Sequence, residues 1–275
     1  MTDDPALPPP QILRDADVGG NGWMLLIGTT EQSYVDLDDP THLEFDYVQR
    51  IAGAIDLVAP RGQRIRVVHV GGAGMTLPRY IAHTRPTSAQ LVLEPDADQT
   101  ALVRGRLPLP KQSGIKVRAV DGLNGIAALR DDYADVVVLD AFHGAQVPAE
   151  LTTVEFFADC HRVLDHGWLM INITDSGKLG YSRRVVAAVR TVFRNVVLSA
   201  EPSTFKGRRF GNLVIVATDR APDLAALERS ARQGAFPYRV LAGEALERFV
   251  AGAVPFAGAD RAPSPPPPRG RGGLG

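Results

Sequence analysis

From Ile65 onward the sequence alternates between short apolar runs and longer amphipathic stretches, and this alternation restricts the folds open to the chain. The first four apolar runs show little polar alternation, which is typical of strands covered on both faces. The stretches between them have helical spacing, so the pattern predicts parallel strands joined by crossover helices. The last two runs follow each other without a helix and predict an antiparallel pair. The runs are 65–70, 90–93, 115–120, 136–139, 168–173, 196–198 and 213–217.

The pattern divides the chain into four parts. We expect a flexible N-terminal tail over 1–20, a β-hairpin and helix over 21–60, an α/β domain over 61–255 and a disordered Pro/Gly-rich tail over 256–275. The hairpin is expected around the turn 28–30 and its helix near Thr41, directly after Pro40. Two short helices, 223–233 and 243–251, complete the prediction. The fold class is therefore α/β, a doubly wound, mostly parallel seven-stranded sheet of Rossmann type with a small N-terminal β-unit.

Composition and charge exclude several partners. Lysine and arginine number 30 and the acidic residues 31, so the net charge of -1 gives no overall field that would attract nucleic acid or a membrane. No apolar run approaches the roughly 18 residues of a membrane span, and the first residues are acidic, unlike a signal peptide. We expect a cytoplasmic protein with neither partner. The single cysteine, Cys160, is expected to be a buried structural thiol.

Residues suited to a nucleotide site follow the first four strands. Open α/β sheets bind ligands at the carboxyl ends of their strands, so residues just after each run are the candidates. Each alone has an ordinary structural explanation, a tight turn for glycine or a helix N-cap for aspartate. Their occurrence at four strand ends favours a ligand site. They are Gly71, Gly72 and Gly74, then Glu94, then Asp121 and Gly122, then Asp140 with His143.

The spacing of these residues also bears on the cofactor. An acidic residue about 20 positions beyond the glycines can bind both ribose hydroxyls, in dinucleotide and adenosyl-sulfonium sites alike. The third glycine of a nicotinamide-binding turn is missing, because Leu77 follows Met75 and Thr76. Asp121 is suited to the exocyclic amine of adenine. The pattern favours S-adenosylmethionine or its decarboxylated relative, and no metal is expected.

These residues resemble the spermidine synthase (polyamine aminopropyltransferase) family of the class I methyltransferase-like superfamily, over roughly residues 23–218. That family has a GGGDGG turn, an acid ending strand two, an Asp-Gly after strand three, a D-S-S-D loop after strand four, and a D-E-F-x-Y-x-E helix. The matching segments here are 71–77, Glu94, 121–122, 140–143 and 43–49. Gln32 resembles the family's N-terminal glutamine near the ligand.

The resemblance implies roles for the matched residues. Glu94 would bind ribose and Asp121 adenine, while Asp140 with Tyr47 would orient and deprotonate an attacking amine. The co-substrate would be decarboxylated S-adenosylmethionine or S-adenosylmethionine, and the partner a small-molecule amine. Family members pair as dimers, so the apolar residues 23–27 would either form a homodimer interface or cap the protein's own core.

The chain departs from the family at the positions that bind polyamine. Ala73 replaces the aspartate of the glycine-rich turn, His143 the second loop aspartate, and Leu43 and Gln49 the outer acids of the helix motif. His143 is a candidate base, and Asp46, Asp175 and Glu150 are candidate replacement acids. Three hypotheses follow: an aminopropyltransferase-like enzyme with a different acceptor or donor, an S-adenosylmethionine-dependent methyltransferase, and a non-catalytic binding protein of the same fold.

Overall fold

The chain forms a large sheet and a small sheet. The computed structural model describes residues 8–15, 20–233 and 235–268. The small sheet is antiparallel, with β1 (Pro10–Arg14), β2 (Gly22–Ile27) and β3 (Thr30–Asp36) in that order. The large sheet has eight strands in the order β11-β9-β10-β8-β7-β4-β5-β6. Their bounds are β4 Arg66–Val70, β5 Ala89–Leu93, β6 Ile115–Arg118, β7 Ala134–Leu139, β8 Leu164–Asp175, β9 Asn195–Ala200, β10 Gly211–Thr218 and β11 Arg239–Leu241.

Strand direction follows the predicted rule. The neighbours β8, β7, β4, β5 and β6 pair in parallel, whereas β10, β9 and β11 form antiparallel pairs at the other end. The chain moves outward from β4 through β5 to β6 and then returns to β7 on the other side of β4. The point between β4 and β7 is a topological switch, where crevices open at the carboxyl ends of strands.

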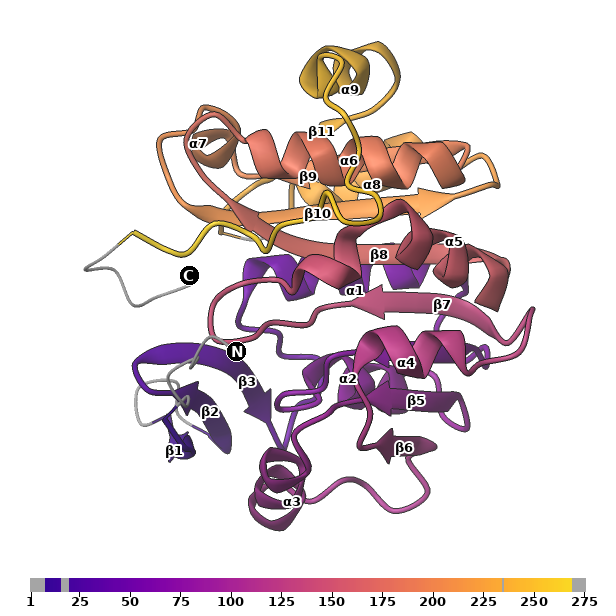
Figure 1. Ribbon diagram of the computed structural model, residues 1–275. Helices are drawn as coiled ribbons and strands as arrows, with labels where there is room; N and C mark the ends of the chain where they lie inside the picture. The colour runs from indigo at the N-terminus through magenta and orange to yellow at the C-terminus, as the bar shows by residue number, and fades with distance from the viewer. Residues whose placement is uncertain (1–7, 16–19, 234, 269–275) are drawn as a thin grey trace.

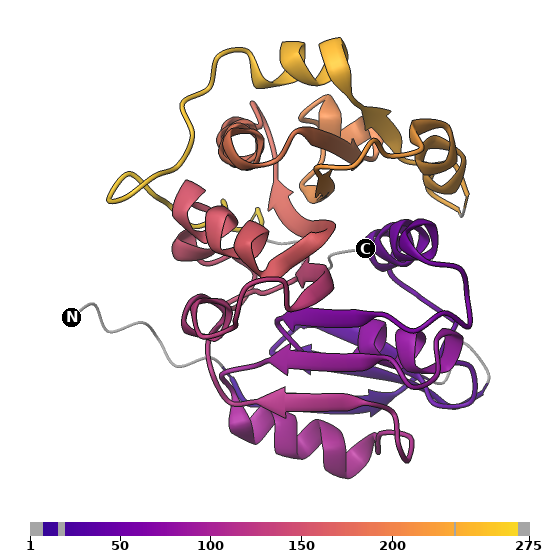
Figure 2. The same cartoon turned by 90° about the vertical axis from the view of Figure 1, so that its right-hand side faces the viewer.

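Helices cover both faces of the large sheet. One face packs against α1 (Asp46–Val58), α2 (Thr76–Thr84) and α8 (Leu224–Ala231), and the other against α4 (Gly122–Ala127), α5 (Val154–Val163), α6 (Gly180–Val192) and α9 (Gly243–Val250). Figure 2 shows these two helical layers, with α1 in indigo and α5 and α6 on the opposite side. The small sheet encloses its own core against α3 (Ala97–Arg106). The remaining short helices are η1 (Ala149–Thr152) and α7 (Pro202–Phe205).

All seven predicted strands are present, and β11 is one strand more than expected. Its three residues pair with β9 from 239 to 241, a length too short for a sequence pattern to reveal. The helix expected near Thr41 begins at Asp46 instead. The carboxylate of Asp39 accepts hydrogen bonds from the Thr41 amide at 2.9 Å and hydroxyl at 2.6 Å, so a local turn replaces the first helical turn.

Both expected tails are partly ordered. Residues 10–14 of the expected N-terminal tail form β1, with Ile12 buried against the small sheet's core. The expected disordered segment 256–275 is packed against the domain over its described part, where Phe256 and Ser264 are buried. Residues 1–7, 16–19 and 269–275 of these tails lie outside the described residues. Composition misled both predictions, because segments containing proline and glycine here pair as strand β1 or pack against the domain at Phe256 and Ser264.

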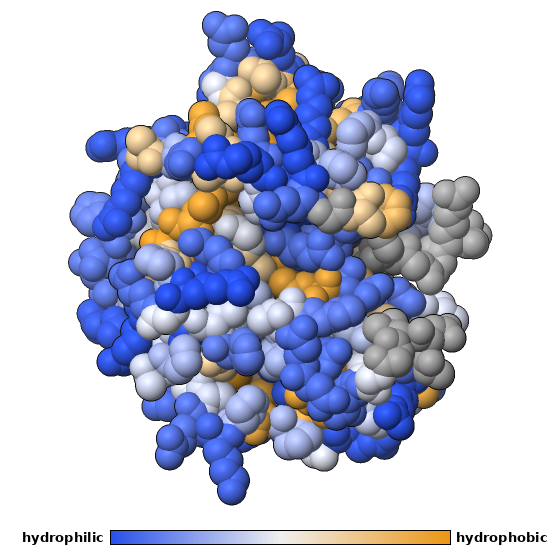
Figure 3. Space-filling view, turned by 180° about the vertical axis from the view of Figure 1, so that it is seen from behind, coloured by the Kyte–Doolittle hydropathy of each residue, from blue (hydrophilic) through white to orange (hydrophobic). Residues whose placement is uncertain are grey.

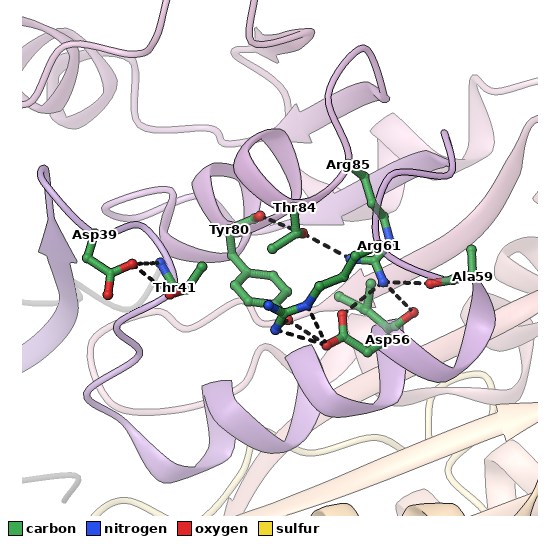
Figure 4. Close-up of polar contacts among 9 residues, drawn as sticks. Asp39, Thr41, Asp56, Ala59, Arg61, Tyr80, Thr84 and Arg85 are labelled. Carbon is green, nitrogen blue, oxygen red and sulfur yellow. Dashed lines mark hydrogen bonds and ion pairs between the residues drawn. The ribbon is translucent and has the colours of Figure 1, made fainter.

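A polar network fastens α1 to α2 at the ends away from the small sheet (Figure 4). The fully buried guanidinium of Arg85 donates to Asp56 Oδ1 at 2.8 Å and to the Ala59 carbonyl at 2.6 Å. Tyr80, on α2, donates its hydroxyl to Asp56 Oδ2 at 2.8 Å and accepts from Arg61 at 3.0 Å. Because a buried charge needs such partners, the network holds the two helices in one relative position. Tyr47 at the start of α1 is thereby held relative to the turn that precedes α2.

The face of the molecule seen from behind in Figure 3 is mainly hydrophilic, with small, separate apolar patches. Within the described ranges, no helix combines the length and the hydrophobicity needed to span a lipid bilayer.

The turn after β4 brings its backbone against that of β7. Gly71 has φ +95°, and a Cβ at this position would collide with the backbone carbonyl of Asp140. Two residues without glycine's freedom, Ala73 with φ 34° and Met75 with φ 60°, are also left-handed. Such strain persists where the surroundings hold it and is common at functional sites. The turn therefore depends on Gly71 for both its conformation and its contact with β7.

We predict that Gly71→Ala destabilises the protein by more than about 2 kcal/mol, since strain at positive φ and the clash with Asp140 add together. Gly62→Ala is the matched control, because Gly62 has φ +88° with no atom near the added Cβ. Urea denaturation should show a loss of about 1 kcal/mol for the control. Equal losses for the two variants would contradict the close approach.

Candidate active site

A cleft opens between the carboxyl ends of β4, β5 and β7 and the small sheet, and we call it the main cleft. In Figure 1 the arrows of these strands point toward the side on which the small sheet lies. The lining of the main cleft includes nine of the ten predicted site residues. These are Gln32, Tyr47, Gly71, Gly72, Glu94, Asp121, Gly122, Asp140 and His143.

Glu94 connects the end of β5 to the glycine-rich turn. Its Oε2 accepts hydrogen bonds from the Gly72 amide at 2.9 Å and the Ala73 amide at 3.4 Å, and its Oε1 accepts from the Asp96 amide at 3.1 Å. Only 8% of the residue is exposed. Charge-assisted bonds of this kind are strong, so Glu94 holds the backbone of the turn in place while it lines the cleft.

Asp121 caps α4 at the rim of the main cleft. Its Oδ1 accepts from the Asn124 amide at 2.8 Å and its Oδ2 from the Asn124 side chain at 2.7 Å. The backbone hydrogen bond from Asn124 is the main reason that the pKa of Asp121 is lowered. The N-cap that we kept as an ordinary explanation for this residue is therefore real, and it fixes the carboxylate beside Gly122.

Asp140 is the central carboxylate of the main cleft. Asn172, on β8, donates its Nδ2–H to Asp140 Oδ1 at 2.9 Å, and the Tyr47 hydroxyl from α1 is also hydrogen-bonded to this carboxylate. Burial raises the pKa of Asp140 to about 6, although the hydrogen bonds from Asn172 and Tyr47 oppose this rise. Asp140 therefore changes charge close to neutral pH.

Tyr47 serves as a donor in this arrangement. Burial, followed by the charge of Asp140, holds the pKa of Tyr47 well above its usual value. The phenol accordingly stays protonated, because a second negative charge beside Asp140 would be unfavourable. Tyr47 and Asn172 together hold the Asp140 carboxylate in place at the cleft wall.

Four further candidate residues were expected near the ligand, and one of them lines the main cleft. Gly74 does not line the main cleft, and its amide donates to Ser33 Oγ at 3.0 Å, which joins the turn to β3. Asp175 is also absent from the lining: its Oδ2 accepts from the amide and hydroxyl of Ser182 and so holds the start of α6. Asp46 is not in the lining, whereas Glu150 is.

The loop after β7 forms one wall of the cleft. His143 and Gln146 pair through backbone hydrogen bonds of 2.8 and 3.2 Å. Gln32, from β3, donates its side-chain amide to the Gly144 carbonyl at 3.4 Å. Gln32 therefore both lines the cleft and contacts this wall, and His143 lies exposed at its edge.

A second, smaller cavity, which we call the inner chamber, lies beneath the glycine-rich turn on the α1 side. It shares Tyr47 and Asp140 with the main cleft, and its other walls are largely apolar. His69 lies buried in its wall, with Nε2 3.0 Å from Gln90 Oε1. Burial lowers the pKa of His69 to about 4, so the imidazole is neutral at physiological pH. Among the described residues, Asp140 is the one carboxylate that lines the inner chamber.

The charges around the main cleft have one sign. Five carboxylate side chains line it, and no lysine or arginine does so among the described residues. They are Glu94, Asp96, Asp121, Asp140 and Glu150. Clefts lined by one charge concentrate ions of the opposite charge, so this one favours a cationic ligand. Within the described part of the chain, no group of three or more His, Cys, Asp or Glu side chains is arranged to hold a metal ion.

Comparisons with known proteins show what the chain is similar to in sequence and in fold. No family model matches the chain. The polyamine aminopropyltransferase of Chromobacterium violaceum is 26% identical over 211 residues, which cover 76% of this chain and 77% of that protein. The crystal structure of a probable spermidine synthase from Corynebacterium glutamicum superposes with a TM-score of 0.84 and 29% identity, over 91% of this chain and 93% of that one. A spermidine synthase in complex with the transition-state analogue AdoDATO has a TM-score of 0.55 and 16% identity, over 87% and 79% of the chains, and shares the fold.

The strand order and the crevice at its switch point define a class I methyltransferase-like α/β protein. Within that class, the chain is spermidine synthase-like, and the resemblance expected from the sequence is confirmed.

Sequence reasoning missed the residues that support the site. Asn172 lies inside an apolar strand, and a single buried amide there carries no recognisable pattern. Ser33 and His69 contribute through contacts with segments distant in the chain, 41 and 21 residues away respectively. The polar interruption of otherwise apolar strands at His69 and Asn172 is the one signal that could have indicated them.

The raised pKa of Asp140 predicts a pH-dependent stability. Its folded-state value of about 6 lies above its ordinary value of 3.8, so the folded protein loses stability as the pH rises through this window. The advantage of Asp140→Asn over the wild type should grow by about 2 kcal/mol between pH 4 and 8 in urea titrations. The pH dependence of the stability difference should have the opposite sign for Asp121→Asn. The lowered pKa of Asp121 stabilises the folded protein at pH values above the ordinary pKa of an aspartate. A pH-independent difference for Asp140→Asn would refute the assignment.

Proposed function

We propose that the protein is a spermidine synthase-like transferase that binds decarboxylated S-adenosylmethionine in the main cleft and transfers its aminopropyl group to a small amine. The observation that carries this proposal is the cleft's lining of carboxylates, with no lysine or arginine among the described residues, and the cluster of Asp140, Tyr47 and Asn172 beside it. The sulfonium and the amine are both cations, which such a lining attracts. The similarity to polyamine aminopropyltransferases supports the same reaction class.

The nucleoside is proposed to lie between β4 and β5. Glu94 would accept hydrogen bonds from the ribose hydroxyls, and Asp121 with Gly122 would flank the adenine. Gly71 and Gly72 have no side chains, so the turn would leave room for the ligand. A Cβ at Gly72 would crowd Val92 and Glu94, the residue proposed to bind the ribose. Gln32, which touches the loop after β7, would close the site from the small sheet.

The chemical step requires a neutral amine. The amine nitrogen attacks the carbon next to the sulfonium, a C–N bond forms, the C–S bond breaks, and its electron pair returns to sulfur to give methylthioadenosine. Asp140 takes the proton that the amine loses, which is the role of a general base. Its pKa of about 6, raised by burial, leaves it ionised at neutral pH yet able to accept a proton. Tyr47 and Asn172 keep its carboxylate in position.

The carboxylate lining also distinguishes between donors. S-adenosylmethionine carries a carboxylate, and the described lining of the main cleft has five acidic side chains and no lysine or arginine to pair with it. The amides of Gly72 and Ala73, which could otherwise bind that carboxylate, are bonded to Glu94. Like charges at short range in a partly buried site repel strongly. The decarboxylated donor lacks this group and fits the site better.

The amine acceptor is proposed to carry one cationic nitrogen near Asp140. Apart from Asp140, the described lining of the inner chamber consists of apolar side chains, hydroxyl groups and a neutral His69. Ala73, Leu43 and Gln49, which stand where the family has acids, supply no further charge. Burying a second ammonium without a partner is costly. His143, exposed at the rim, stays a proposed second base.

Incubation with each donor and a panel of amines tests the function. We expect methylthioadenosine by mass spectrometry with decarboxylated S-adenosylmethionine, and a rate lower by about 10²–10⁴-fold for Asp140→Asn. S-adenosylhomocysteine formed from S-adenosylmethionine would establish a methyltransferase instead. Neither product, together with no thermal shift by methylthioadenosine, would establish a non-catalytic protein.

The pH dependence of kcat/KM should report Asp140. Activity is predicted to fall about tenfold per pH unit below pH 6, where the raised pKa of Asp140 lies. Asn172→Leu removes a hydrogen bond that lowers this pKa, so its acid limb should move to higher pH. Asn212→Leu is the control, since Asn212 is a buried amide on β10 that lies outside the cluster of Asp140, Tyr47 and Asn172. Identical limbs in the wild type and Asn172→Leu would exclude Asn172 from this role.

The proposal also includes the assembly of the protein and its location in the cell. The partly exposed apolar side chains of β2, Trp23, Met24, Leu26 and Ile27, support pairing as a homodimer through the small sheet. A cytoplasmic location fits the single buried thiol of Cys160. Light scattering on the eluted protein measures the assembly.

A further inference from the structure

The segment after α9 crosses the molecule to the main cleft. In Figure 1 its yellow trace leaves α9 and runs past α5 toward the side where the strands end. Several contacts anchor its first part: the Phe256 carbonyl accepts from the Val154 amide at 2.9 Å, and Arg184 lies 4.0 Å over the Phe256 ring. Arg184 also pairs with Asp260 at 2.6 Å. The segment is thus fixed to the starts of α5 and α6 before it reaches the cleft.

Ser264 joins the end of this segment to the loop after β7. Its amide donates to the Val147 carbonyl at 3.1 Å, and its Oγ accepts from the Val147 amide at 2.8 Å. The side-chain amide of Gln146 donates to the Ser264 carbonyl. Ser264 is fully buried, as is Val147. One residue therefore satisfies both backbone groups of Val147 in a loop that has no regular strand partner.

The same serine connects the loop to β8. Its Oγ lies 3.3 Å from Thr174 Oγ1, in the same strand as Asn172, which holds Asp140. Thr174 is fully buried. Pro263, the neighbour of Ser264, lines the main cleft. The C-terminal segment thus supplies part of the cleft wall and links the loop to the strand that positions the central carboxylate.

We propose that residues 256–264 act as a strap that holds the loop 143–148 in its ligand-binding position, and that Ser264 is the positioning residue of this strap. From the small sheet, the side chain of Gln32 reaches the loop through a long bond to the Gly144 carbonyl at 3.4 Å. Ser264 provides the stronger attachment, through bonds that water cannot replace at a buried site. Without it the loop would open more often and the wall formed by 143–148 would be less ordered.

Hydrogen–deuterium exchange on the full-length protein tests the strap without any ligand. Ser264→Ala removes the hydroxyl's bonds to Val147 and Thr174 and should raise exchange in 143–148 about fivefold, the equivalent of about 1 kcal/mol. Ser113→Ala is the control: Ser113 accepts one side-chain bond, from the Ile115 amide at 3.4 Å, before β6 and away from the cleft. Thr174→Val, which spares the Val147 bonds, should give a smaller increase in the same peptide.

Ligand measurements then connect the strap to the site, and this part rests on the proposed function. Methylthioadenosine should bind Ser264→Ala roughly fivefold more weakly by calorimetry, and KM for the donor should rise more than kcat falls. Exchange that is unchanged in 143–148, or raised equally across the large sheet, would overturn the strap. Normal binding of methylthioadenosine by Ser264→Ala, in a variant whose segment 143–148 exchanges faster, would also overturn the strap proposal. If the wild type binds no methylthioadenosine while the exchange of 143–148 responds as expected, the proposed function fails and the strap's hold on the loop stands.

Discussion

The close approach between the turn after β4 and the start of the loop after β7 is the contact on which the rest of the site depends. A side chain at Gly71 would collide with the Asp140 backbone, so these two segments meet only because one of them has no Cβ. The approach brings the Glu94-bonded turn and the Asp140 carboxylate to one opening. Parallel strands from neighbouring crossovers make this possible, because their carboxyl ends lie at one edge of the sheet.

Placing carboxylates together without cations has an energetic cost, and the structure limits that cost by hydrogen bonding. Glu94 accepts from backbone amides, Asp121 from Asn124, and Asp140 from Asn172 and Tyr47. The hydrogen bonds to Asp121 and Asp140 stabilise the ionised form that a cationic ligand would meet. The burial of Asp140 is the exception that remains unfavourable, since its pKa stays raised to about 6 by burial. A site that is costly while empty gains most when a cation enters it.

The sequence predicted the fold well because its signals are local. Apolar runs bounded by glycine and acidic residues identify strands and their ends, and the rule for open sheets then places Gly71, Glu94 and Asp140 together. It could not predict the contribution of Asn172 or Ser264, since each acts through partners 32 and 117 residues away. The C-terminal segment was expected to be disordered because of its composition. Its proline-rich composition says nothing about a buried serine that pairs with a distant loop.

A crystal structure of the protein with methylthioadenosine tests the central claim most directly. The account predicts the ribose hydroxyls within hydrogen-bond distance of Glu94, the adenine beside Asp121 and Gly122, and the sulfur directed toward Asp140. Nucleoside density elsewhere, or a cleft in which Glu94 and Asp121 make no contact with the ligand, would contradict it.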